Sequence, residues 1–166
     1  MNRIFFLMAI FITASSHAAS DRAEIRFRGE LAYNPCIIKT ENVQIDFGML
    51  TDSSFDSSGH TAWEKFSLIF EKCPVGLRNV DATFWGEPSW DFPECSYENT
   101  GTAENVTIQL ESEDAGRGLG NGRAYSVPIE NGMAEMRLVT RIKQKEGKFF
   151  TPGTVEGVVA VVLTYR

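Results

Sequence analysis

Three cysteines and one histidine are the residues after position 18 that are best suited to chemistry: Cys36, Cys73, Cys95 and His60. Thiols and imidazoles bind metal ions, but structural metal sites need paired ligands at short spacing. The chain has no C-x-x-C pair, and His60 is the only histidine after position 18. We therefore expect no metal site, and three thiols leave one over once a disulfide has formed.

The remaining polar residues do not form a catalytic pattern. Asp52 and Asp56 lie near His60 in a stretch rich in Ser and Gly, but their spacing is not that of an EF-hand. We interpret both aspartates as turn residues and His60 as a solvated surface residue. No nucleophile elbow and no histidine-based dyad is visible in the sequence. The sequence therefore predicts neither an enzyme nor a bound cofactor.

Aromatic residues offer a second kind of chemistry, the stacking of sugar rings. Trp85, Trp90 and Phe92 could form such a platform, although packing on their own domain is the favoured interpretation for a Pro-rich loop. The segment Asn105-Val-Thr107 matches a glycosylation acceptor, but it lies in a predicted strand and carries little weight.

The first 18 residues have the features of a secretory signal. Arg3 supplies the positive start, residues 4–12 are mostly apolar, and Ser16-His17-Ala18 is a small-x-small cleavage site, with a cut after Ser20 as the alternative. The apolar run is too short for a transmembrane helix, so no membrane insertion of the mature chain is expected. Loss of Arg3 takes the net charge from −6 to −7. Such an acidic domain is a poor candidate for binding nucleic acid.

Short alternating runs separated by turn residues fill the rest of the chain, without a helical period. This pattern predicts an all-β sandwich of seven or eight strands, with a hairpin at Asn131-Gly132. Strands are expected in residues 33–40, 43–48, 63–73, 80–85, 105–110, 124–129, 133–142 and 153–165, and loops in 51–61, 86–101 and 111–122. The predicted inward sets are Phe66, Leu68 and Phe70; Val80, Ala82 and Phe84; and Val106, Ile108 and Leu110.

The last stretch, residues 153–166, is the strand around which the chain is organised. Both of its alternating sets are apolar through the middle, so we expect cover on both faces. We also expect no later segment to pair with its edge, and an open apolar edge invites another chain. One set is Val155, Gly157, Val159, Val161, Leu163 and Tyr165, and the other is Glu156, Val158, Ala160, Val162 and Thr164.

Residues 23–31 alternate cleanly between apolar and charged side chains, which predicts a strand that needs a sheet to join. Ala23, Ile25, Phe27, Gly29 and Leu31 face one way, and the charged Glu24, Arg26, Arg28 and Glu30 face the other. This segment is either the first strand of the same sandwich or a strand given to another copy. Head-to-tail pairing between chains would give this segment a sheet to join and would give the last strand a partner at its open edge.

Taken together, the sequence resembles the chaperone–usher pilus subunits, in particular the small minor subunits of type 1 pilus tips. Four features carry the resemblance over essentially the whole mature chain. They are Phe27-Arg-Gly-Glu-Leu31 shortly before Cys36; the pair Cys36 and Cys73, with Cys73-Pro-Val-Gly76 after Trp63-Glu-Lys-Phe-Ser-Leu; residues 99–110; and a Gly fourteenth from the end with a penultimate Tyr, here Gly153 and Tyr165.

The resemblance implies an immunoglobulin-like sandwich that lacks its last strand and carries an N-terminal donor-strand extension. It implies a signal peptide at 1–18, the extension at 19–32 and a pilin domain at 33–166. It also implies a disulfide between Cys36 and Cys73, whereas Cys95 has no partner in the family pattern and is expected to be a free or intermolecular thiol without catalytic reactivity. The implied donor residues are Ile25, Phe27, Gly29 and Leu31, and the implied groove residues are Gly153, Val155, Val159, Val161, Leu163 and Tyr165.

The implied partners are a periplasmic chaperone, an outer-membrane usher and adjacent pilus subunits. The protein would be exported through the periplasm to a cell-surface fimbrium, where it supports adhesion as a structural subunit, with a contact of Tyr165 to the chaperone implied as well. The alternative function is a sugar-binding adhesin module. Adhesins of this family resemble two-domain chains, and this chain has room for one domain.

Overall fold

The computed structural model describes Arg26, Arg28 and residues 35–166. The chain divides into residues 1–31 and 32–166. Arg26 and Arg28, the described residues of the first unit, are both exposed. The signal segment and the predicted donor residues Ile25, Phe27, Gly29 and Leu31 lie outside the described residues. The architecture below is that of the second unit.

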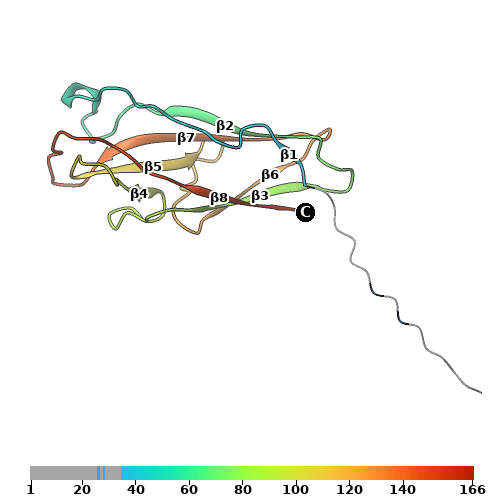
Figure 1. Ribbon diagram of the computed structural model, residues 1–166. Coiled ribbons are helices and arrows are strands. Elements are labelled where there is room, and N and C mark those ends of the chain that lie inside the picture. Colours follow the sequence, from blue (N-terminus) through green and yellow to red (C-terminus); the bar gives the residue numbers. More distant parts are fainter. Residues whose placement is uncertain (1–25, 27, 29–34) are drawn as a thin grey trace, which may run out of the picture. The chain divides into compact units, whose positions relative to one another are not determined.

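Residues 35–166 form two antiparallel sheets, and no α-helix occurs among them (Figure 1). The five-stranded sheet has the order β1-β2-β7-β5-β4, with β1 Ile37–Ile38, β2 Glu64–Glu71, β7 Ala134–Gln144, β5 Val106–Ser112 and β4 Ser96–Glu98. The three-stranded sheet has the order β6-β3-β8, with β6 Ala124–Pro128, β3 Asn79–Trp85 and β8 Ala160–Tyr165. A 3₁₀ turn, η1, spans Asp52–Ser54. The all-β prediction is confirmed.

The core lies between the inner faces of these sheets, and the alternation of β2 and β3 predicts it well. Phe70, Val80 and Ala82 are 0% exposed. β5 departs from the prediction because Thr107 and Gln109 are buried as well as Val106 and Leu110. The reason is cover on its outer side, where the Gln109 amide lies 3.6 Å from the Cys95 thiol.

The sequence predicted a hairpin at Asn131-Gly132, and the structure has a two-residue turn there. Both residues have positive φ, 51° and 75°, which a type I′ turn requires. Glu130 and Met133 exchange backbone hydrogen bonds across it. The two strands that it joins, β6 and β7, belong to different sheets. The predicted hairpin pairing of these strands is therefore wrong, and the turn links the two layers of the sandwich.

Three sequence predictions about strands were wrong. Residues 43–48 form no strand, residues 86–101 contain β4, and the last strand begins only at Ala160. Upstream of β8 the chain follows the loop at 99–103 instead, because Ala103 N donates to Thr154 O at 3.0 Å and Thr100 N donates to Glu156 O at 2.9 Å. Over residues 154–156, hydrogen bonds to a loop distant in sequence thus take the place of a ladder with β3.

Candidate functional site

The backbone of β8 has one edge bonded to β3 and a second edge, here called the free edge, on which no described strand lies. β8 pairs only with β3 among the described strands (Figure 1). Asn79 and Arg166 exchange both backbone hydrogen bonds. Because bonded and non-bonded pairs alternate along an antiparallel ladder, the bonded partners in β8 are Ala160, Val162 and Thr164.

The backbone groups of Val161, Leu163 and Tyr165 therefore point away from β3. Their side chains lie on the core together with Val159, and all four are half-buried. We call Val159, Val161, Leu163 and Tyr165 the apolar row. Burial raises the pKa of the Tyr165 phenol. This edge thus carries peptide groups with no hydrogen-bond partner among the described strands, directly beside partly covered apolar side chains.

The opposite face of β8 is uncovered by the described chain. Val162 is 55% exposed, and Val158, just before the strand, is 85% exposed. The expectation that both faces of this stretch are covered is therefore wrong for the single chain. Half-buried apolar side chains also reach the same core from other elements, namely Ile38, Phe66, Tyr125 and Ile129.

Gly153 and Val155 lie outside β8, although the sequence placed them in the same strand. Val155 is half-buried. Gly153 packs against the loop at residues 102–103, where a Cβ on Gly153 would lie 2.3 Å from the Ala103 nitrogen. The need for glycine at this position is a close approach of two backbone segments. Of the six predicted groove residues, the structure brings four together on one edge.

The cysteines divide as the resemblance implied. Cys36 and Cys73 form a disulfide with a Cα–Cα distance of 4.2 Å, which ties the start of β1 to the end of β2. Cys95 is a free thiol and is buried. Its pKa is raised by burial, so the thiol is protonated at neutral pH. Burial also withholds it from the intermolecular bond that the sequence left open.

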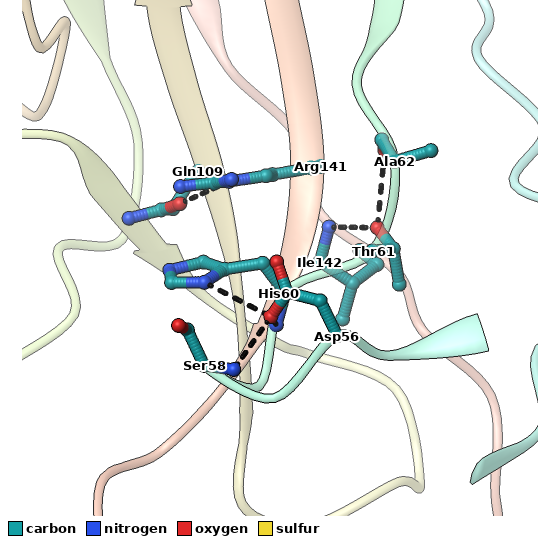
Figure 2. A network of polar contacts seen from close by, with 8 residues as sticks. All are labelled: Asp56, Ser58, His60, Thr61, Ala62, Gln109, Arg141 and Ile142. Atoms are coloured by element: carbon teal, nitrogen blue, oxygen red, sulfur yellow. Dashed lines mark hydrogen bonds and ion pairs between the residues drawn. The ribbon is translucent and has the colours of Figure 1, made fainter. Parts of the chain in front are cut away.

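His60 belongs to a polar network and is not the solvated residue that we expected (Figure 2). Asp56 accepts backbone hydrogen bonds from Ser58 at 2.8 Å and from His60 at 3.0 Å, which supports its interpretation as a turn residue. The pKa of His60 is lowered by burial and by the charges of Arg141 and Lys143, against the opposite effect of Asp56. Gln144 N donates to Gly59 O at 2.8 Å, and Thr61 N donates to Ile142 O at 3.0 Å, which holds this loop on β7.

The aromatic residues considered for sugar stacking lie in different environments. The Lys143 ammonium sits 3.0 Å from the centre of the Phe92 ring. Trp90 is 88% exposed, so its expected packing on the domain is wrong, and Trp85 is 48% exposed. A different tryptophan, Trp63, stacks with the Arg141 guanidinium at 4.0 Å. The alternation of β7 contains a signal for this pair, because Arg141 lies on its outer face.

Comparison with known proteins establishes what kind of chain this is. No family model matches the sequence. Protein FimG of Escherichia coli K12 is 31% identical over 166 residues, which cover 98% of this chain and 96% of FimG. The chain belongs to the fimbrial subunits. The uncharacterized fimbrial-like protein YdeR of the same organism is 29% identical over 97% of this chain and 96% of YdeR.

Solved structures share the fold of this fimbrial subunit. A chain from a chaperone–usher pilus studied for rod uncoiling has a TM-score of 0.69 at 18% identity, over 92% of this chain and all of that one. The P pilus rod subunit PapA has a TM-score of 0.67 at 20% identity, over 80% of this chain and all of PapA. The P pilus adaptor subunit PapF gives 0.55 at 13% identity, over 81% and 98%.

The protein is therefore a structural subunit of a pilus, with the immunoglobulin-like sandwich of that family. Within the part of the chain that the structure describes, no helix is long and apolar enough to cross a membrane.

Proposed function

We propose that this subunit is a minor adaptor of a pilus tip that polymerises by donor-strand exchange. It accepts a strand of one neighbour along the free edge of β8 and donates residues 23–31 to the other neighbour. The observation that carries the proposal is the free edge itself, where the backbone groups of Val161, Leu163 and Tyr165 point away from β3, meet no other described strand and lie beside the apolar row.

An added strand meets two needs of that edge at once. It supplies hydrogen-bond partners for the three residues, and its side chains cover the apolar row on every second position. Strand addition of this kind is the established mode of chaperone–pilin complementation. The donor segment 23–31 has the required alternation, with Ile25, Phe27, Gly29 and Leu31 as its apolar set.

The proposed partners follow from the same edge. Before assembly, a periplasmic chaperone covers the apolar row and an outer-membrane usher receives the complex, and Tyr165 at the end of the row is the proposed chaperone contact. The similarity to FimG over nearly the whole of both chains and the fold shared with the adaptor PapF support an adaptor position. The finished subunit lies in a fimbrium on the cell surface and supports adhesion.

The test removes a backbone donor of β8 that the β3 ladder does not use. The N–H of Val161 points to the free edge, so Val161→Pro removes a donor that β3 does not use, at a position where an edge strand accepts proline. Val161→Ala is the matched control, because it also removes the valine side chain but keeps the N–H. The measurement is the rise in Tm when a donor peptide is added to the mature chain.

We expect the peptide to raise the Tm of the wild type and of Val161→Ala, and to have little effect on Val161→Pro. An equal rise for Val161→Pro would show that the peptide does not pair with β8, and the proposal would fail. Circular dichroism of the variants without peptide checks that all three chains fold alike.

A further inference from the structure

The outer face of β8 carries an apolar surface. This surface stays exposed even when another strand covers the apolar row. Val162 is 55% exposed and Trp85 is 48% exposed. Ala160 is also exposed and pairs directly with Trp85. We call Trp85, Ala160 and Val162 the outer patch. Alternation along β8 places it on the face opposite to the apolar row.

Val162 is the edge member of a row that crosses the three-stranded sheet. Ala124 in β6 pairs with Thr83 in β3, and Thr83 pairs with Val162 in β8. Beyond Val162 no described strand follows. The cross-strand neighbour of Val162 is therefore supplied by whichever strand is added to the edge.

The alternation of side chains along the added strand decides which of its residues becomes that neighbour. Residues that cover the apolar row alternate with residues that lie beside Ala160 and Val162, whichever way the strand runs. In residues 23–31 of this chain the second set is entirely charged: Glu24, Arg26, Arg28 and Glu30. A second copy of this chain would thus place charged side chains beside the outer patch.

We propose that the outer patch selects the incoming strand, favouring a different subunit whose outward residues are uncharged and β-branched or aromatic over a second copy of this chain. The inference rests on the proposed donor-strand exchange and adds a rule of partner choice to it. A β-branched or aromatic residue packs against Val162 as a cross-strand pair, whereas a charged one gains little packing there.

Two peptides with the same inward set test this selection. The first is residues 21–32 of this chain, and the second is the same peptide with Glu24→Thr, Arg26→Thr, Arg28→Thr and Glu30→Thr. Both are offered together to the mature chain, and the ratio of the two complexes is measured by native mass spectrometry. We expect the threonine peptide to be preferred about three- to tenfold, because cross-strand pairs differ by that order in affinity.

The variants Val162→Glu and Ala124→Glu identify the residue responsible. Both add one carboxylate to the same face and the same row, but Ala124 lies two strands from the free edge. Val162→Glu should abolish or reverse the preference, because a carboxylate at 162 can pair with an arginine of the first peptide. Ala124→Glu should preserve it.

The possible outcomes distinguish a failure of selection by the outer patch from a failure of donor-strand exchange. Equal binding of the two peptides to the wild type, a preference for the first peptide, or the same loss of preference in Ala124→Glu would overturn selection by the outer patch while leaving strand exchange intact. Failure of both peptides to bind the wild type would also overturn selection by the outer patch, whereas strand exchange itself is judged separately by the comparison of Val161→Pro with Val161→Ala.

Discussion

Gly153 lies against the backbone of Ala103, so closely that a Cβ on the glycine would be 2.3 Å from the Ala103 nitrogen. The contact joins the segment that leads into β8 to the loop before β5. Thr102 N and Thr154 Oγ1, 3.0 Å apart, bond the same two segments. The position of the apolar row therefore depends on a contact some distance before the strand itself.

Replacing Gly153 with alanine should destabilise the subunit by about 1–3 kcal/mol, since the added methyl forces two backbone segments apart. Gly157→Ala is the matched control in the same segment, because its Cβ would clash only with the end of the flexible Ile108 side chain, at 2.6 Å. Urea unfolding of both variants measures the difference in the free energy of unfolding. A Gly153→Ala subunit as stable as Gly157→Ala would show that the contact is not required.

The Cys36–Cys73 disulfide closes a loop of 37 residues. The double variant Cys36→Ala, Cys73→Ala should lose about 4 kcal/mol of unfolding free energy, chiefly because the unfolded chain gains freedom. Addition of a reductant should destabilise the wild type and Cys95→Ala alike and leave the double variant unchanged. A reductant effect that disappears in Cys95→Ala would point instead to a disulfide made by Cys95.

Local patterns predicted the strands whose partners bury one clean face. β2 and β3 follow their alternation because Phe70 and Val80 each meet the opposite sheet, and the turn at Asn131 follows from the backbone that Asn-Gly favours. The cysteine pairing and the family also came from the sequence, through motifs spread over the chain.

Long-range contacts account for what the sequence did not predict. The start of β8 depends on where residues 154–156 leave the loop at 99–103. The alternation within residues 153–165 does not indicate that this loop is the partner. His60 looked solvated because its neighbours in sequence are polar, while Arg141 and Lys143 approach it from β7. The free edge was inferred from apolar content, but the division into an apolar row and an outer patch required the register with β3.

Acid should weaken the network around His60. The folded-state pKa of His60 lies below its ordinary value of about 6.5, so the unfolded chain binds more protons as the pH falls through that value. The corresponding stability is present above about pH 6.5 and is lost on acidification toward the lower folded pKa. His60→Gln should flatten this part of the stability–pH profile, measured by urea unfolding between pH 7.5 and about 5. An unchanged slope would assign the acid sensitivity to other groups.

The donor segment gives the last prediction. Gly29 interrupts the bulky apolar set of Ile25, Phe27 and Leu31, and glycine inside a strand often marks a close approach of another backbone. We expect Gly29→Leu to slow or block strand exchange into the next subunit, because the added side chain has no room against that subunit's core.

The subunit's own fold and its chaperone complex should survive this change, since the proposed extension serves the neighbour and not the domain of residues 33–166. Arg28→Ala is the control on the opposite, charged set, and it should exchange at nearly the wild-type rate. The experiment purifies each variant with its chaperone and follows transfer to a neighbouring subunit by native gel. Transfer of Gly29→Leu at the wild-type rate would remove Gly29 from the mechanism. Loss of the chaperone complex itself would show instead that residues 23–31 are a strand of the subunit's own sandwich.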